Sequence, residues 1–314
     1  MAGKTILSCG EALIDMLPRE TTAGEAAFAP YPGGAVFNTA VALGRLGAPS
    51  GFLSGLSTDL FGEILEDFLS ASKVDTQLAV RSDRPTTLAF VKLVDGQASY
   101  AFYDENTAGR MLTPADLPAI PESVGALFFG GISLVVEPCG EFYETLMLRE
   151  AKKHVTMLDP NIRVGFIRDE VGYRARVDRM IAAADIVKVS DEDLRWIAGE
   201  GGIADLARDI LARGPRAVFV TEGAKGAHGF AGDDAVFVPG RKVTVADTVG
   251  AGDTFNAGIL AALHAAGRLD KTAVSSLSTA DLTAALSLGN RAASVTVARA
   301  GANPPWADEL PGEE

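Results

Sequence analysis

The chain has 314 residues, of which 47% are hydrophobic and 22% are charged, and its formal net charge at pH 7 is -13. Such a chain can bury a large core, so we expect a single domain over 1–314 with a small appendage. The negative charge disfavours nucleic acid or an anionic membrane as a partner. We expect neither a membrane-spanning segment nor a signal peptide. Cys9 and Cys139 have neither metal-site nor disulfide spacing, which predicts free thiols and a cytoplasmic protein.

The first elements predict a ligand pocket. Thr5–Cys9 is typical of a short buried strand, and the segment over 10–15 is expected to leave it as a loop ending at Asp15. Gly33 and Gly34 then introduce a predicted helix over 35–46. Adjacent glycines before a helix let the backbone approach a ligand closely, and Asn38 points back toward that opening. Without Asp15 upstream, the glycine pair would indicate only a turn at the start of a helix.

The pattern changes after a β-α unit formed by a strand over 51–54 and a helix over 59–72. The runs over 86–93 and 98–103 are rich in β-forming residues and flank a turn over 94–97, so they predict a hairpin. A hairpin inserted into a β-α series is not expected to join the main sheet. We therefore predict a small β lid built chiefly from 86–103. The alternative is an edge hairpin that contacts no ligand.

The remaining elements alternate between strand and helix. Strands are expected over 126–129, 155–158, 185–189 and 217–220, and helices over 137–153 and 279–297. This alternation predicts a three-layer α/β/α fold with a mainly parallel sheet. Ligands in such folds bind outside the carboxyl ends of the strands, so the polar residues there are candidates for a site. Only the tail over 304–314 is expected to be loose.

The most informative stretch is Asp-Thr-Val-Gly-Ala-Gly-Asp-Thr-Phe-Asn-Ala-Gly over 247–258. A strand is expected to end over 242–245, and a helix follows until Gly267. The amides of Gly250, Ala251 and Gly252 at the start of this helix would be unpaired and would form an anion site. Asp253 beside them suits a base that takes a proton from an attacking hydroxyl during phosphoryl transfer. The alternative is a glycine turn in which Asp253 caps the helix.

Two common nucleotide-binding motifs do not occur in the sequence. Phe255 occupies the third glycine position of a dinucleotide fingerprint, and no P-loop pattern is found. A dinucleotide-dependent oxidoreductase is therefore disfavoured, since an acidic ribose partner is not evident either.

The stretch Asp247-Thr-Val-Gly-Ala-Gly-Asp253-Thr-Phe resembles the C-terminal signature of the ribokinase-like (PfkB-type) carbohydrate kinases. Gly33-Gly34-Ala35 with Asn38, Asp159-Pro-Asn161-Ile-Arg163 and Thr221-Glu-Gly223 follow in the family's order, so the resemblance covers nearly the whole chain. Within the family, the chain is most similar to bacterial fructokinases. The resemblance implies ATP-dependent phosphorylation of a sugar hydroxyl, with Asp253 as base and the amides over 250–253 as anion hole. Arg163 and magnesium would neutralise charge on the phosphoryl group.

On the sugar side, the resemblance implies that the carboxylate of Asp15 accepts hydrogen bonds from two hydroxyls; otherwise Asp15 would be a surface turn residue. Gly33, Gly34, Asn38 and Asn161 complete this pocket, and Phe90 or Phe102 of the lid would cover it. We also consider a homodimer formed through the lid. Many fructokinases have an arginine just after the aromatic pair at 102–103, whereas this chain has Asp104, and its next arginine is Arg110. Arg110 either contacts the sugar or lies on the surface.

On the nucleotide side, Thr221, Gly223, Lys225 and Gly226 resemble the family's triphosphate loop, and Asn290 lies where the family contacts adenine. Ser190 and Asp193 stand in place of an Asn-x-x-Glu pattern that organises water around magnesium, although they could equally form a helix N-terminus. Asp247, Val249 and Gly301 correspond to the monovalent cation site of ribokinases. Pro305 replaces a frequent ligand there, which leaves potassium open.

The substrate is expected to be fructose, because an acidic sugar such as 2-keto-3-deoxygluconate would need a dedicated arginine. A 2-keto-3-deoxygluconate kinase is the alternative enzyme. A sugar-sensing regulator of the same fold is the alternative outside enzymes, and the presence of Asp253 argues against it.

Overall fold

Most strands join one large sheet, which positions the loops of the site. The computed structural model describes residues 4–94 and 97–312. Nine strands form this sheet in the order β15-β14-β13-β12-β11-β10-β1-β4-β6. All neighbours pair in parallel except β13 with β14 and β14 with β15. The strands are β1 (Thr5–Cys9), β4 (Ser50–Leu53), β6 (Val74–Asp75), β10 (Val124–Gly130), β11 (Val155–Asp159), β12 (Ile186–Ser190), β13 (Ala217–Thr221), β14 (Gly226–Ala231) and β15 (Asp234–Pro239).

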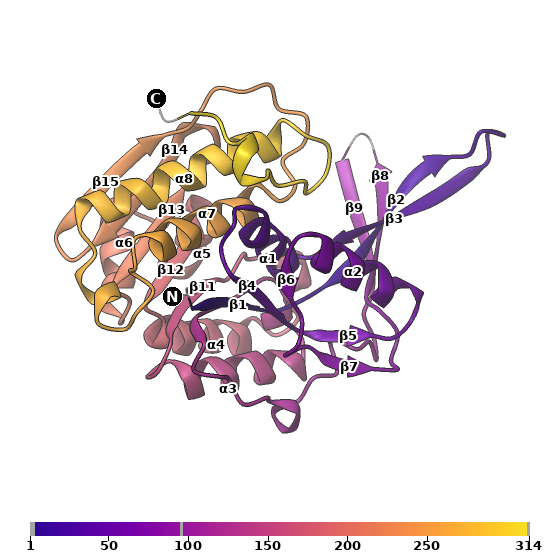
Figure 1. Ribbon diagram of the computed structural model, residues 1–314, viewed down its shortest axis with the longest axis horizontal. Coiled ribbons are helices and arrows are strands. Elements are labelled where there is room, and N and C mark those ends of the chain that lie inside the picture. Colours follow the sequence, from indigo (N-terminus) through magenta and orange to yellow (C-terminus); the bar gives the residue numbers. More distant parts are fainter. Residues whose placement is uncertain (1–3, 95–96, 313–314) are drawn as a thin grey trace.

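Helices cover both faces of this sheet and produce the predicted three layers (Figure 1). Strands such as β10 are apolar and buried throughout, as expected for a parallel sheet covered on both sides. One face packs against α1 (Ala35–Arg45), α2 (Leu60–Ala71), α7 (Ala251–Ala265) and α8 (Thr279–Val297). The other face packs against α3 (Cys139–Glu150), α4 (Glu170–Ala183), α5 (Asp191–Ala198) and α6 (Ile203–Ala212). In the part of the chain described, no helix is long and apolar enough to cross a membrane.

The contact between α7 and α8 is unusually close because each helix places a glycine at the crossing. A Cβ atom on Gly258 would lie 2.5 Å from the Cα of Gly289. The two helices also share a hydrogen bond of 3.0 Å between the hydroxyls of Thr296 and Thr254. The start of α7 is therefore held firmly against the end of α8.

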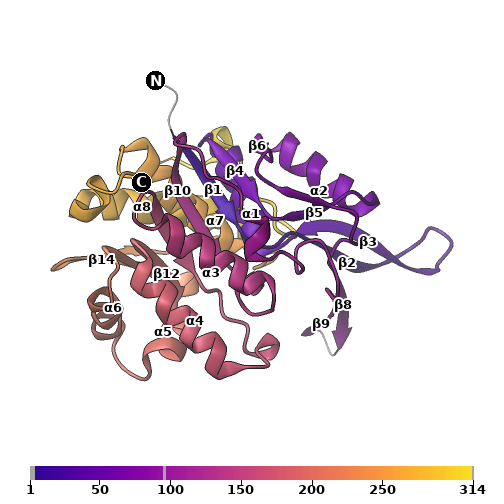
Figure 2. The same ribbon diagram turned by 90° about the horizontal axis from the view of Figure 1, so that it is seen from below.

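A second sheet projects from the side of the body (Figure 2). Its four strands have the order β3-β2-β8-β9 and comprise β2 (Leu13–Glu20), β3 (Ala26–Gly33), β8 (Leu88–Val94) and β9 (Gln97–Tyr103). The hairpin of β8 and β9 was predicted, although two residues of its predicted turn, 95 and 96, lie outside the described residues. The β2–β3 ribbon was not predicted, and the expectation of a loop ending at Asp15 was wrong. Two further short strands, β5 (Gly55–Ser57) and β7 (Val80–Ser82), pair separately.

Two other local predictions were wrong. Residues 242–245 form no strand, because β15 ends at Pro239 and pairs only with β14. The β-branched side chains of this stretch, including Val245 at 58% exposure, lie at the surface instead. The predicted loose tail is anchored as far as Pro311, whose carbonyl accepts a hydrogen bond of 2.9 Å from Arg291 Nε. Arg45 donates hydrogen bonds of 2.9 Å to Asn303 Oδ1 and to the carbonyl of Pro304, and its guanidinium stacks over the ring of Trp306.

Candidate active site

The loops that follow the parallel strands meet at one edge of the large sheet and are joined by hydrogen bonds. Glu11, just after β1, accepts hydrogen bonds from the backbone amides of Ala35 at 2.9 Å and Ser133 at 3.2 Å. Asp193 in α5 accepts one from the amide of Ile162 at 3.2 Å. These bonds tie the loop after β1 to the loop after β10, and the loop after β11 to the helix after β12. The amide of Gly131 joins the two pairs by donating to the carbonyl of Asp159 at 3.3 Å.

The N-terminus of α7 lies over this edge. Gly250 precedes the helix in the left-handed region with φ 77°, which a residue with a side chain adopts only under strain. In the described part of the chain, the amides of Gly250, Gly252 and Asp253 donate to no acceptor. The prediction that the amide of Ala251 is unpaired was wrong, because it donates to the carbonyl of Thr248 at 3.3 Å and closes the turn before the helix. Unpaired amides at the positive end of a helix dipole favour an anion.

Asp253 is buried in the first turn of α7. Its carboxylate accepts a hydrogen bond of 2.9 Å from Asn38 Nδ2 of α1, and its carbonyl accepts one of 3.2 Å from the hydroxyl of Thr39. Asp253 does not cap its helix with its side chain, as the alternative interpretation would require. Burial raises the pKa of Asp253 to about 7, because the ionised carboxylate loses its hydration, while the bond from Asn38 acts in the opposite direction.

Asp15 lies in β2 against the glycine pair. A Cβ atom on Gly33 would lie 2.3 Å from Asp15 Oδ2, so only glycine leaves room for this carboxylate. Burial raises the pKa of Asp15 to about 6. Among the described residues, no donor reaches its oxygens, which leaves them available to a ligand. The side chain of Asn38, on the helix that follows, connects this region with Asp253.

The register of the second sheet separates the two aromatic residues that were predicted to cover a sugar. Asp15 pairs with Ala89, and Ala89 pairs with Phe102, so Asp15 and Phe102 lie on the same face. Phe102 contacts Phe166, in the 3-10 turn Val164–Phe166 outside the lid, in an edge-on arrangement with ring centroids 4.6 Å apart. Phe90 lies on the opposite face, and its prediction as a pocket residue was wrong.

Arg110 is engaged in an ion pair. Its Nη1 lies 2.9 Å from Asp104 Oδ1, and its Nε donates to the carbonyl of Glu137 at 3.2 Å. Both side chains of the pair are about three-quarters buried. The positive charge of Arg110 is thus balanced by Asp104, which stands where many fructokinases have an arginine. Arg163 is exposed, and in the described part of the chain the only hydrogen bond of its side chain goes to the carbonyl of Ile162.

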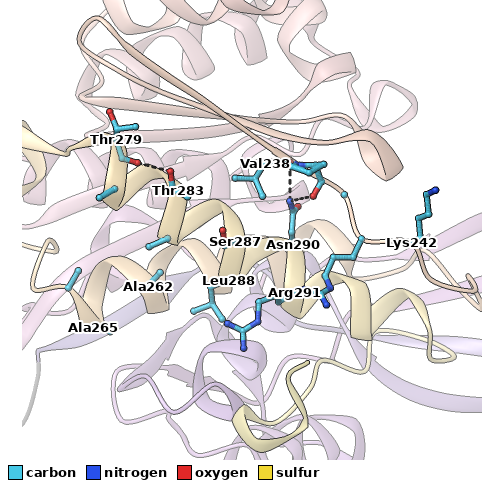
Figure 3. A pocket seen from close by; sticks show the side chains of 16 residues that line it. Val238, Lys242, Ala262, Ala265, Thr279, Thr283, Ser287, Leu288, Asn290 and Arg291 are labelled. Carbon is cyan, nitrogen blue, oxygen red and sulfur yellow. Dashed lines mark hydrogen bonds between the residues drawn. The ribbon is translucent and has the colours of Figure 1, made fainter. Parts of the chain in front are cut away.

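The residues predicted to bind a nucleotide lie at the ends of β12 and β13, in the turn before β14 and on α8, where Asn290 lines a groove. Ser190 and Thr221 are neighbours in the register of β12 and β13. The 3-10 turn Gly223–Lys225 contacts the end of β15 through a bond from Gly240 to the carbonyl of Lys225. Figure 3 shows Asn290 donating to the carbonyls of Val238 and Pro239, both at 3.2 Å. This groove has a volume of about 1380 Å³. Gly226 begins β14 beside the same strand end.

The residues predicted to bind metals are occupied by structural contacts. Ser190 caps α5 by accepting from the amide of Asp193, which is the helix N-terminus of the alternative interpretation. The carboxylate of Asp247 accepts from the amides of Val249 at 3.0 Å and Gly301 at 2.9 Å, so it fixes the loop before α7 to the chain after α8. The described residues contain no group of three or more acidic, histidine or cysteine side chains arranged around a metal ion.

Comparison with known proteins identifies the family. The model of the pfkB family carbohydrate kinases matches residues 4–309. The chain belongs to this family. It is 58% identical over 272 residues to a fructokinase of Rhizobium leguminosarum bv. trifolii, covering 87% of this chain and 83% of the relative. A crystal structure of a fructokinase with bound ATP from Xylella fastidiosa superposes with a TM-score of 0.82 at 29% identity, covering 96% of this chain and 94% of that one.

A third relative was solved with a sugar and a nucleotide bound. This fructokinase variant from Vibrio cholerae was crystallised with fructose, ADP and a potassium ion, and it superposes with a TM-score of 0.83 at 26% identity. The alignment covers 96% of this chain and 94% of the Vibrio chain. The predicted family and the predicted α/β fold with a small second sheet are therefore confirmed.

Sequence reasoning missed three polar residues of this kinase that lie behind the site: Glu11, Lys188 and Asn256. Lys188 Nζ lies 2.9 Å from Asp159 Oδ2, and Asn256 Nδ2 lies 2.7 Å from the same oxygen. A lysine within the apolar strand sequence Ile-Val-Lys-Val was the available signal, because a lysine is rarely fully buried unless it is paired.

The high pKa of Asp253 predicts a pH-dependent cost in stability. A carboxyl whose pKa is raised on folding binds its proton more tightly in the folded state, so the folded kinase loses stability as pH rises from about 4 to 7. Asp253→Asn removes this dependence. We predict that its advantage in unfolding free energy over the unmodified kinase grows by on the order of 2–4 kcal/mol between pH 4 and pH 8.

Urea unfolding across that pH range measures the effect, and Asp233→Asn in the exposed turn between β14 and β15 is the matched control. If the free energy of unfolding changes with pH in the same way for Asp253→Asn and for the control, the high pKa of Asp253 is contradicted.

Proposed function

We propose that this kinase transfers the γ-phosphoryl group of ATP to a hydroxyl of fructose, acting as one catalytic unit over 1–314. The observation that carries the proposal is the buried carboxylate of Asp253 beside the unpaired amides of α7. A base with a pKa near the working pH is well suited to remove a proton from a hydroxyl, and this base lies where phosphoryl charge is stabilised. The names of the similar proteins support the same reaction.

The two substrates would reach Asp253 from opposite sides. The sugar would lie between Asp15 and Asn38, with the glycine pair beneath it and Phe102 above it. The nucleotide would occupy the groove along α8, with its phosphates directed toward the amides of Gly252 and Asp253. Holding both reactants in line removes most of the entropic barrier of a two-substrate reaction.

Each named residue has a defined part in this transfer. Asp253 would take the proton of the sugar hydroxyl as its oxygen bonds to the γ-phosphorus, while the bond between the γ-phosphorus and the β-phosphate oxygen breaks and ADP leaves. The unpaired backbone amides of Gly250, Gly252 and Asp253 would donate hydrogen bonds to the equatorial oxygens, and the exposed guanidinium of Arg163 would donate to the same group from the loop after β11. Asp193 would help to hold magnesium through water, and the ion would supply positive charge that neutralises the phosphates further. Burial raises the pKa of Asp193, but the bond from Ile162 leaves acceptor capacity on its carboxylate.

Fructose is favoured over an acidic sugar by the ion pair of Asp104 and Arg110. A sugar carboxylate near this pair would gain little from Arg110, because Asp104 already neutralises it. A 2-keto-3-deoxygluconate kinase is therefore the second candidate, and a sensor without turnover is the third. A coupled assay of ADP formation with fructose, ribose, 2-keto-3-deoxygluconate, tagatose and adenosine distinguishes them, and a lack of turnover with every sugar would refute the proposal.

The base assignment predicts a large catalytic defect. Asp253→Asn should lower kcat by roughly 10²- to 10⁴-fold, because proton removal is lost, while the KM for ATP stays similar or falls. In the unmodified enzyme, kcat/KM should rise with pH through about 7 as Asp253 loses its proton. Steady-state kinetics measure both effects, with Asp233→Asn as control. Unchanged turnover in Asp253→Asn would refute the mechanism.

The sugar assignment predicts that a change at Asp15 affects the KM for fructose but not the KM for ATP. A carboxylate that accepts from two hydroxyls contributes on the order of 1.5–3 kcal/mol, so Asp15→Ala should raise the KM for fructose tens of fold and leave that for ATP nearly unchanged. Fructose should also exceed 2-keto-3-deoxygluconate in kcat/KM, with only a modest change in Arg110→Ala. If 2-keto-3-deoxygluconate is preferred and Arg110→Ala abolishes that preference, the second candidate is the substrate and fructose is not.

A potassium ion is proposed at the loops that Asp247 joins. Carbonyl groups near Val249 and Gly301 would surround the ion, and their order would help to fix the start of α7. Rates in potassium and in a bulky organic cation at equal ionic strength should then differ several-fold. Identical rates would remove potassium from the mechanism.

We also propose a homodimer through the outer face of the lid and a cytoplasmic location, where ATP is available. Phe28, Phe90 and Tyr103 form an aromatic cluster on that face, with centroid distances of 5.0 Å and 5.4 Å. Phe28 and Tyr103 are 49% and 62% exposed, which a partner subunit would reduce. A monomer in sedimentation at micromolar concentration would refute the dimer.

A further inference from the structure

A buried ion pair lies beneath the first turn of α7, and the proposed reaction gives it no role. Lys188 in β12 is 5% exposed, and Asp159 at the end of β11 is 2% exposed. Their charged atoms are 2.9 Å apart. Removing two charges from water is costly, so a pair of this kind adds little to stability compared with apolar residues of similar size. Its position therefore invites a functional explanation.

Asp159 holds the lysine in a fixed place. Its Oδ2 accepts from both Lys188 Nζ and Asn256 Nδ2, and its Oδ1 accepts from the amide of Asn161 at 3.2 Å. The amide of Asn256 is oriented by this contact, which leaves its own buried Oδ1 without a partner among the described residues. The carboxylate thus joins β11 and β12 to α7.

The ammonium group faces the anion site. A Cβ atom on Gly252 would lie 3.4 Å from Lys188 Nζ, so the lysine approaches the helix at one of the residues whose amides are unpaired. Asn256 follows one turn later in the same helix and points to the same carboxylate. The positive charge lies behind the first turn of α7, on the side of the sheet.

The groups around Asp253 give this charge a purpose. Asp159 from β11 and Glu11 from the connection after β1 both disfavour its ionised form. Lys188 from β12 acts in the opposite direction, as does the neutral side chain of Asn38 from α1. Asp193 of α5 faces the same two residues, Asp159 and Lys188. Without the lysine, several carboxylates would surround a site that must receive the phosphates of ATP.

We propose that Lys188, anchored by Asp159 and Asn256, is a positioning residue that fixes the first turn of α7 and balances negative charge at the anion site during phosphoryl transfer. The inference rests on the proposed kinase reaction. A purely structural ion pair would hold β11 against β12 without affecting the titration of Asp253. The two roles therefore differ in the pH dependence of catalysis.

The test compares pH profiles of kcat/KM for fructose in four variants. The acid limb of each profile is the range in which kcat/KM rises with pH as Asp253 loses its proton. Lys188→Met removes the positive charge and should move this limb to higher pH by about half to one unit. We expect kcat to fall roughly ten- to hundredfold and the KM for fructose to change by no more than about threefold. Asp159→Asn removes a negative charge and should move the limb downward. The double variant should return the limb close to its original position while kcat stays low. Lys188→Arg should keep the limb in place.

Thermal unfolding of each variant accompanies the kinetics. The double variant removes both buried charges with groups of similar size, so it is expected to fold even where Lys188→Met alone does not. The inference would be overturned if the acid limbs of all folded variants coincide and if kcat falls only in proportion to the loss in Tm. Lack of turnover in the unmodified kinase would overturn the proposed function and the inference together, whereas normal turnover with coincident limbs would overturn the inference alone.

Discussion

The hydrogen bond from Asn38 to Asp253 joins two residues that lie 215 positions apart in the sequence, and the site depends on it. Asn38 belongs to the helix that follows the glycine pair, and Asp253 belongs to the helix that carries the unpaired amides. The bond therefore fixes the proposed sugar side and the proposed phosphate side of the site relative to each other. The same bond favours the ionised carboxylate and partly offsets the effect of burial, which raises the pKa of Asp253. One contact thus influences both the geometry and the proton affinity of the proposed base.

Charge burial is the recurring cost of this arrangement. Asp253, Asp159 and Lys188 are each less than a tenth exposed. The ionised form of each side chain would be more stable in water, yet all three lie buried near the ends of strands of the large sheet. The packing of α7 against α8 through Gly258 and Gly289 supplies the rigid support that such a site needs. Stability is thus lower at the site and recovered in the apolar layers on both sides of the sheet.

The sequence was sufficient to predict the alternating strands and helices, the β8–β9 hairpin and the stretch around Asp253, because each has a strong local pattern. The β2–β3 ribbon escaped prediction because its three prolines, Pro18, Pro30 and Pro32, argue against a strand, and only pairing between the two strands overrides them. The two faces of the lid depend on register, which no local pattern specifies, so Phe90 and Phe102 could not be told apart. Lys188 and Asn256 acquire their meaning only from Asp159, a partner distant in the chain.

Strand alternation in the lid also limits how its length can change. Asp15 shares its face of the lid with Phe102, toward the proposed sugar pocket, whereas its neighbour Met16 pairs with Phe90 on the outer face. One residue inserted between Gly10 and Asp15 would exchange these faces, turning the carboxylate outward and an apolar side chain inward. The turn over 21–24 lies at the far end of the ribbon and has no such constraint. Natural length variation among relatives is therefore expected to concentrate at that tip, which also makes it the suitable place to insert a label or a reporter peptide.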